Sequence, residues 1–232
     1  MKTVGLLGGM SWESTLNYYK LINEGVKREL GGLNSAKLCL YSVNFSEIEK
    51  MQHQGRWDET AKILSEAAIA VEKGGADFLL ICTNTMHKVA TAIEARLSIP
   101  LLHIADATAE KLLAANIKKV GLLGTAFTME QDFYKGRLTD KFGIEVAVPE
   151  PDDRKIVHDI IYQELCKGEI KPESRSLYLT IIDKLKKDAG AEAVILGCTE
   201  IAMLVQQPHT DIQLFDTTAI HAERAINIAL LD

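Results

Sequence analysis

The stretch Val4-Gly5-Leu6-Leu7-Gly8 recurs later in the chain as Val120-Gly121-Leu122-Leu123-Gly124. Each copy is an apolar run of the kind found in buried parallel strands, and each is broken by a glycine turn. A second pair of segments repeats in the same order: Gly75-Ala76-Asp77 and Gly190-Ala191-Glu192, both followed by apolar residues. Because repeats this far apart do not form a solenoid, they indicate two similar α/β lobes.

Short apolar runs alternate with segments of helical periodicity along the whole chain. The expected strands are residues 4–7, 37–43, 78–81, 101–104, 120–123, 145–148, 193–196 and 213–215, and the expected helices are residues 60–73, a segment from about 108, 129–139, 154–167, 175–187 and 217–231. This alternation predicts crossover units and parallel sheets. We expect residues 1–103 with 214–232 to form the first lobe, and residues 104–213 to form the second.

Two of the expected strands end in thiol and hydroxyl side chains. The run Phe78 to Ile81 leads into Cys82-Thr83-Asn84-Thr85, and the run Ala193 to Leu196 leads into Gly197-Cys198-Thr199-Glu200. Open α/β sheets place ligands at the carboxyl ends of their strands. If the lobes face each other, both strand ends line one cleft, which is the usual place for a binding site.

Such a pair of strand ends suits proton transfer at a chiral carbon. Removing the proton next to a carboxylate, and returning one on the opposite face, needs an acid and a base on either side of the carbon. A thiolate is a competent base near neutral pH when its pKa is lowered. The Asn84-Thr85 and Thr199-Glu200 pairs are expected at helix N-caps, where backbone N–H groups hold a carboxylate.

Composition narrows the class of protein. The 232 residues include 47% hydrophobic and 25% charged residues, which is typical of a globular domain, and the net charge of −6 argues against nucleic acid or an anionic membrane as a partner. No apolar run is long enough to span a bilayer, and the N-terminus lacks the apolar core of a signal peptide. The four cysteines show neither zinc-site nor disulfide-scaffold spacing. We therefore expect a cytoplasmic protein without a metal ion.

The chain resembles the aspartate/glutamate racemase family, in particular the bacterial broad-specificity amino acid racemases. The resemblance covers essentially the full length and is carried by VGLLGGMSWEST at residues 4–15, CTNTMHK at 82–88, GTxxTM at 124–129 and GCTEI at 197–201. It implies an α/β fold of two pseudo-symmetric parallel-sheet lobes, an active site in the cleft between them, and a possible homodimer. It also implies racemisation of a small-molecule amino acid without pyridoxal phosphate, and hence a role in D-amino acid metabolism. No cofactor is expected, since the glycine-rich start is neither a dinucleotide-binding nor a Walker motif.

One departure from the family pattern changes the catalytic assignment. The usual first motif is Cys-Asn-Thr, whereas the matching triplet here is Thr83-Asn84-Thr85, which leaves Cys82 one residue early. The glycine repeats give an offset of 116, but aligning Gly75 with Gly190 gives 115, which pairs Thr83 with Cys198. Because side chains alternate faces along a strand, Cys82 would then point away from the substrate. We predict Thr83 and Cys198 as the catalytic pair and Cys82 as a buried small hydrophobe.

A threonine hydroxyl is a far weaker acid than a thiol, so the two directions of catalysis should be unequal. By family analogy, the second-lobe cysteine takes the proton of the L-enantiomer. The sequence therefore predicts two-base catalysis with faster turnover of L-substrates.

Further candidates line the expected cleft. The predicted substrate-binding residues are Met10, Gln52, Asn84, Thr85, Thr125, Thr128, Lys167, Thr199 and Glu200. Several have simpler interpretations: Gln52 in a solvated loop, Lys167 as a cation favoured at a helix C-terminus, and Glu200 as a helix cap or as the group that orients Cys198. His87 matches a family histidine and is a candidate structural residue.

Two other functions stay open on this evidence. Relatives with this architecture include decarboxylases and cis-trans isomerases that use the same cysteine positions. A catalytically weak amino-acid-binding protein is the alternative of a different class. The preferred substrate, aspartate, glutamate or a broader range, depends on loop geometry near Met10, Gln52 and Lys167.

Overall fold

The computed structural model describes residues 1–231, and the chain forms two compact units. The first comprises Met1–Ile104 together with the C-terminal segment from His221 onward, and the second comprises Ala105–Ile220. Each unit has its own parallel sheet and its own hydrophobic core, which confirms the expected pair of α/β lobes.

The first unit is built on four parallel strands in the order β2-β1-β3-β4. These are β1 (Val4–Gly8), β2 (Leu38–Ser42), β3 (Phe78–Ile81) and β4 (Leu101–Leu102). Every residue of the two central strands, β1 and β3, is buried, which explains why both read as unbroken apolar runs.

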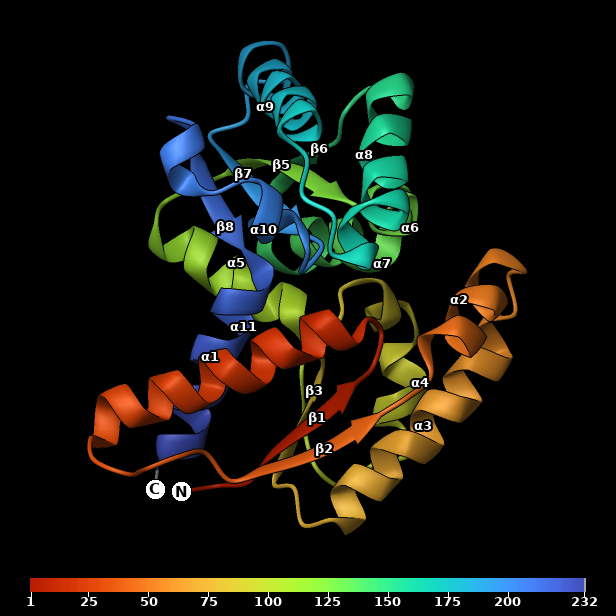
Figure 1. The fold of residues 1–232 in the computed structure, drawn as a ribbon, viewed down its shortest axis with the longest axis vertical. Coiled ribbons are helices and arrows are strands. Elements are labelled where there is room, and N and C mark those ends of the chain that lie inside the picture. The colour runs from red at the N-terminus through yellow and green to blue at the C-terminus, as the bar shows by residue number, and fades with distance from the viewer. Residues whose placement is uncertain (232) are drawn as a thin grey trace. The chain divides into compact units, whose positions relative to one another are not determined.

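Helices cover both faces of this sheet (Figure 1). They are α1 (Trp12–Leu30), α2 (Phe45–His53), α3 (Trp57–Lys73), η1 (Thr85–Val89), α4 (Ala90–Glu94) and α11 (Thr217–Leu230). On one face, Leu7 and Ile81 pack against Leu64 and Val71 of α3. On the other, Leu6 packs in a core with residues of α1 and with Ala222, Ala225, Ile226 and Ala229 of α11.

The second unit repeats this plan, with strand order β6-β5-β7-β8. Its strands are β5 (Lys119–Gly124), β6 (Glu145–Ala147), β7 (Ala193–Gly197) and β8 (Gln213–Asp216). Its helices are α5 (Ile104–Ala114), α6 (Ala126–Glu130), α7 (Asp132–Gly136), η2 (Arg137–Lys141), α8 (Pro151–Gln163), η3 (Leu165–Lys167), α9 (Pro172–Lys187), α10 (Ile201–Leu204) and η4 (Gln207–His209). Helices α8 and α9 supply Val157, Ile161, Ile181 and Ile182 to its main core.

The strand order is thus the same in both sheets, as a sequence duplication predicts. Two differences from expectation lie in the helices. Helix α2 was not predicted, because Phe45–His53 has only a narrow apolar face, with Ile48 and Met51 as its buried apolar residues. The expected helix over 129–139 is split into α6, α7 and η2. Strand β8, placed with the first lobe on sequence grounds, pairs with β7 and lies in the second unit.

Candidate functional site

The pairing register shows which residues occupy equivalent positions at the two strand ends. In the first sheet Val4 of β1 lies beside Phe78 of β3, and in the second Val120 of β5 lies beside Ala193 of β7. Thr83 is five residues beyond Phe78, and Cys198 is five residues beyond Ala193. The strand register therefore follows the offset of 115, and Thr83 and Cys198 are topological equivalents.

The exposure of the side chains also separates Cys82 from Thr83. Cys82 is fully buried, 0% exposed, and packs in the core that β1 shares with α1 and α11. That burial raises the pKa of the Cys82 thiol, which keeps it protonated. Thr83 and Cys198 are both partly exposed, and each follows a run of buried residues. Cys82 is a core residue, as expected from the register.

The loop from β1 to α1 lies against the end of β3. Ser11 caps α1 by accepting a hydrogen bond from the Ser14 N–H, and the Thr15 hydroxyl accepts one from the Gly9 N–H at 2.8 Å. Gly9 has φ +91°, and a Cβ there would lie 2.2 Å from the Val43 carbonyl oxygen, so only glycine fits. The Ser14 hydroxyl donates to the Cys82 carbonyl at 2.8 Å, which ties this loop to the strand end.

Four of the predicted substrate contacts of the first unit are buried: Met10, Gln52, Asn84 and Thr85. Gln52 lies in α2 and is 3% exposed, so it does not belong to a solvated loop. Its Oε1 atom accepts no hydrogen bond from any residue of the described chain. The neighbouring Met51 belongs to the same hydrophobic core as Met10 and Met86.

At the end of β7, one carboxylate organises two donors. Glu200 Oε2 accepts hydrogen bonds from the Cys198 thiol at 3.0 Å and from the Thr199 hydroxyl at 2.6 Å. Burial raises the pKa of the Cys198 thiol well above its usual range, and the Glu200 charge raises it further. Asn84 and Glu200 occupy the N-cap positions of η1 and α10, as expected, but neither side chain makes a capping hydrogen bond. Glu200 instead orients Cys198.

Thr125 and Thr128 sit at the end of β5. Thr125 is the N-cap of α6: its hydroxyl accepts a hydrogen bond from the Thr128 N–H, and the two hydroxyl oxygens lie 3.3 Å apart. His158 of α8 accepts a hydrogen bond from the Ala126 N–H at 3.1 Å, which holds the first turn of α6. Both threonines are buried, and their strand β5 lies beside β7 in the sheet.

Lys167 differs from the other candidates because its side chain is exposed. It ends η3, which is followed by Gly168 in the left-handed region at φ +75°. The segment packs against α10, directly after the Cys198 strand end. Its position fits both a substrate contact and a helix C-terminal cation.

Comparison with known proteins identifies the family of the chain. Residues 7–225 match the family described as Asp/Glu/hydantoin racemase. The chain belongs to this racemase family. A sequence relative, the broad specificity amino-acid racemase RacX of Bacillus subtilis (strain 168), is 24% identical over 98% of both chains.

Solved structures with the same fold include two that cover nearly the full length of both chains. A Yersinia pestis protein provisionally named an Asp/Glu racemase is 55% identical over 100% of each chain, with a TM-score of 0.93. An aspartate racemase homologue from Pyrococcus horikoshii OT3 is 36% identical over 99% of each chain, with a TM-score of 0.85. We accordingly classify the protein as an isomerase of the amino acid racemase type.

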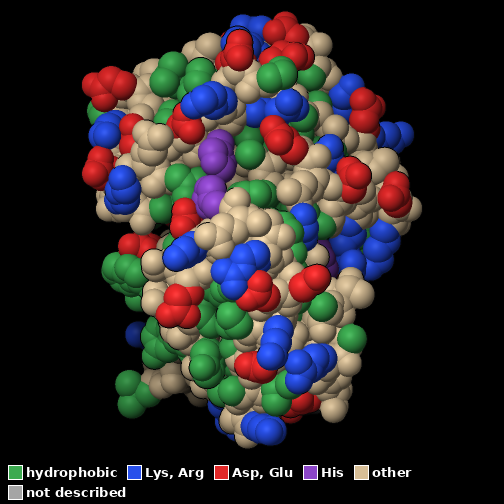
Figure 2. Space-filling view, turned by 90° about the vertical axis from the view of Figure 1, so that its right-hand side faces the viewer, with side chains coloured by type: hydrophobic (Ala, Val, Ile, Leu, Met, Phe, Trp, Pro, Cys, Tyr) green, Lys and Arg blue, Asp and Glu red, His purple; other side chains and the backbone are tan. Residues whose placement is uncertain are grey.

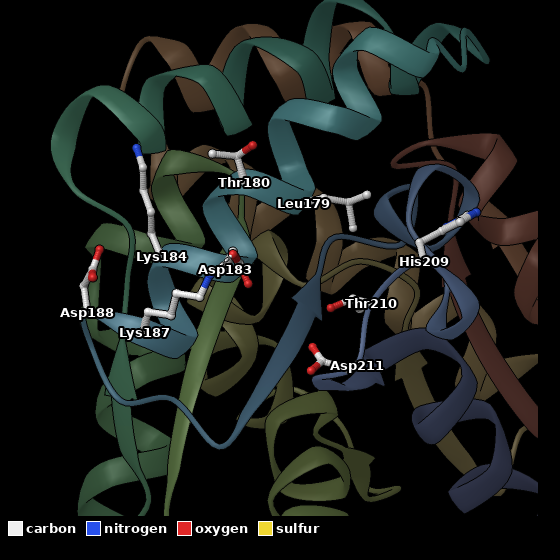
Figure 3. Close-up of a pocket in the computed structure, with 9 residues that line it drawn as sticks. All are labelled: Leu179, Thr180, Asp183, Lys184, Lys187, Asp188, His209, Thr210 and Asp211. Carbon is white, nitrogen blue, oxygen red and sulfur yellow. Dashed lines mark hydrogen bonds and ion pairs between the residues drawn. The ribbon is translucent and has the colours of Figure 1, made fainter.

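A shallow cavity of about 630 Å³ in the second unit contains none of the candidate racemase residues (Figure 3). Its walls come from α9, between Leu179 and Lys187, from Asp188 and from the loop of residues 209–211. Since α9 ends where the chain enters β7, and residues 209–211 precede β8, the cavity lies at the amino-terminal edge of the sheet, opposite Cys198. Its lysines are already paired with carboxylates, such as Lys187 with Asp183. We assign this cavity no part in the reaction.

Charges on the surface are mixed. On the face drawn in Figure 2, Lys and Arg side chains are interspersed with Asp and Glu. Surface ion pairs include Lys155 with Asp159. Among the described residues, no His, Cys, Asp and Glu side chains are grouped to hold a metal ion. Within residues 1–231, no helix combines the length and the apolar character needed to cross a bilayer.

Proposed function

We propose that the protein racemises an α-amino acid without a cofactor, using Cys198 and Thr83 as proton carriers on opposite faces of one Cα. The observation that carries this proposal is the shared register of the two residues at equivalent, partly exposed strand ends. The place of the neighbouring thiol, Cys82, in the core supports the choice of Thr83.

The thiol environment suits a base that is generated on demand. In the resting state burial and the Glu200 charge favour the protonated Cys198 thiol, whose proton points to the Glu200 carboxylate. Loss of that proton to solvent leaves a thiolate, which takes the Cα proton of an L-amino acid. The Thr83 hydroxyl then donates a proton to the opposite face and is reprotonated from water. Because an alkoxide is costly to form, we expect L-substrates to turn over faster than D-substrates.

Substrate contacts follow from the buried polar groups around these carriers. Gln52 Oε1, buried without a donor, suits an N–H of the substrate's α-ammonium group. Backbone and hydroxyl groups of Asn84, Thr85, Thr125, Thr128 and Thr199 are candidates for the α-carboxylate, where the enolate-like charge develops. Lys167 is the candidate partner of a distal carboxylate, so aspartate and glutamate are the first substrates to test, followed by a broader range of amino acids.

The decisive assay is deuterium exchange at Cα. L-Aspartate, L-glutamate and a panel of other L-amino acids, incubated with the protein in D2O, should incorporate deuterium and yield the D-enantiomer of one or more of them. Incorporation is read by mass spectrometry and enantiomers by chiral chromatography. Carbon dioxide release instead of inversion would point to a decarboxylase. Binding without exchange or inversion would leave an amino-acid-binding protein and sink the racemase proposal.

Homodimer formation stays a prediction. Sedimentation of the purified protein over a range of concentrations tests it directly.

A further inference from the structure

Both peptide groups that flank the Thr83 Cα are held by side-chain hydrogen bonds. On one side the Ser14 hydroxyl donates to the Cys82 carbonyl at 2.8 Å. On the other, His87 Nδ1 lies 2.9 Å from the Thr83 carbonyl oxygen. Because these two carbonyls belong to the peptide planes before and after Thr83, the bonds together restrict the direction of its Cα–Cβ bond.

The proton positions on His87 follow from its neighbours. The Ile104 N–H donates to His87 Nε2 at 3.2 Å, so Nε2 is the acceptor of the ring. The proton of a neutral imidazole is then on Nδ1, which donates to Thr83. The ring is 3% exposed and packs against His103, with ring centroids 4.5 Å apart, so it has little freedom to turn. His87 therefore links the Thr83 peptide to the start of α5.

We propose that His87 and Ser14 are positioning residues that aim the Thr83 hydroxyl at the substrate Cα; this rests on the proposed racemase function. Neither residue touches the substrate in this scheme. When Thr83 is aimed correctly, the carbanion formed by Cys198 is protonated on the opposite face. When it is not, Cys198 returns a proton to the face it came from, and in D2O that proton is a deuteron. The substrate then gains deuterium without inverting.

Two substitutions of His87 separate its two hydrogen bonds. In His87→Asn the amide nitrogen occupies the place of Nδ1 and keeps a donor for Thr83. In His87→Gln the amide oxygen occupies the place of Nε2 and keeps the acceptor for Ile104, but the donor to Thr83 is lost. We expect His87→Gln to raise the ratio of deuterium incorporation to inversion about tenfold, since small displacements of a reacting group cost one to two orders of magnitude in rate. His87→Asn should stay close to wild type in that ratio.

His221→Gln is the matched control, because His221 belongs to the same buried group of rings but does not contact Thr83. Its Nε2 donates to the Leu102 carbonyl at 2.8 Å, and its Nδ1 accepts from the Tyr18 hydroxyl at 2.8 Å. This variant should lose thermal stability while leaving the exchange-to-inversion ratio unchanged. Ser14→Ala removes the hydrogen bond to the Cys82 carbonyl and should raise the exchange-to-inversion ratio by a smaller factor than His87→Gln. It tests the positioning role if His87→Gln does not fold.

The outcomes distinguish this proposal from the one on which it rests. Wild-type protein that neither exchanges nor inverts any amino acid refutes the racemase function itself. An active wild type, with folded His87→Gln or Ser14→Ala losing exchange and inversion in equal proportion or losing neither, overturns the positioning role alone.

Discussion

The two units share a strand order, but they end their central strands differently. In the first, the residue in the equivalent position is Thr83, and the one before it is Cys82, whose side chain fills a core with α1 and α11. In the second, the equivalents are Cys198 and Gly197, and a Cβ on Gly197 would lie 2.8 Å from the Leu123 carbonyl oxygen. The two units therefore share the same backbone positions at the ends of β3 and β7. The residue type at each position differs, because the space around it differs.

The strongest test of this difference removes each proton carrier in turn. Cys198→Ala should abolish deuterium incorporation and inversion together, by about 10³-fold or more, since it removes the base for L-substrates. Thr83→Ala should abolish inversion but retain incorporation into the L-substrate. Parallel exchange and chiral assays measure both quantities. Loss of activity in Cys82→Ala with no effect of Thr83→Ala would reverse the assignment.

Thr83→Cys makes the strand ends alike. A thiol is a far better base than a hydroxyl, so turnover of D-substrates should rise by about 10- to 100-fold, while turnover of L-substrates changes less. Initial rates with each enantiomer test this. Equal gains in the two directions would argue against an asymmetric pair.

Glu200→Gln tests the electrostatic part of the second strand end. The amide retains an oxygen for the Cys198 and Thr199 donors but carries no charge, so the pKa of the Cys198 thiol, raised by burial and by Glu200, should fall. The acidic limb of the kcat/KM profile with L-substrate should then move to lower pH. A limb that stays in place or moves to higher pH would contradict this account.

The units also differ in their buried histidines, which predicts unequal acid stability. Burial lowers the pKa of His221 to about 3, against an ordinary value of about 6.5. Between those pH values the unfolded chain binds a proton that the folded one does not. As the pH is lowered through this range, His221 should therefore reduce the free energy of unfolding by up to about 1.4 kcal/mol per pH unit.

Denaturation followed by tryptophan fluorescence measures this effect in the first unit, because both tryptophans, Trp12 and Trp57, lie there. His221→Gln should flatten the pH dependence. In the second unit His158 is partly exposed and His209 is exposed, so hydrogen exchange there should change less between pH 7 and pH 5. Equal acid sensitivity in both units would count against the explanation.

The smallest expected effects concern the residues that precede the carriers. Cys82→Ala should lower the free energy of unfolding by about 1–2 kcal/mol by leaving a small cavity, without changing the exchange-to-inversion ratio. Gly197→Ala should cost about 1–3 kcal/mol, because its Cβ meets backbone. Urea denaturation of the two variants measures both values. A large stability loss for Cys82→Ala beside a neutral Gly197→Ala would show that the register argument misplaces the side chains.

Most of the fold was predictable because buried parallel strands leave a strong signal. Strands β1, β3, β5 and β7 lie within one residue of the expected bounds, and the repeats indicated two lobes. Helix α2 was missed, because Phe45–His53 has only three buried residues, one of them the polar Gln52. Burial of Gln52 depends on packing by segments distant in sequence, which periodicity does not report.

The candidate site was predictable at the strand ends and less so around them. Thr83 could be chosen over Cys82 because the repeat encodes the register. The hydrogen bonds of His87 to Ile104 and of Ser14 to Cys82 join residues 17 and 68 positions apart, so no local sequence pattern indicates them. Asn84 and Glu200 do lie at the predicted N-cap positions, but the short helices η1 and α10 that follow receive no capping hydrogen bond from either side chain.

The path of the C-terminal helix has a consequence for biosynthesis. Helix α11 supplies Ala222, Ala225, Ile226 and Ala229 to the core beside Val4 and Leu6, and the Lys2 N–H donates to the Ala229 carbonyl at 2.9 Å. On a translating ribosome the first strand emerges long before the helix that covers it. The second unit, a continuous segment from Ala105 to Ile220, is complete earlier. Until α11 is made, the part of the sheet face that it shares with α1 lacks that cover, so the first unit is completed after the second, which reverses the usual order of domain folding.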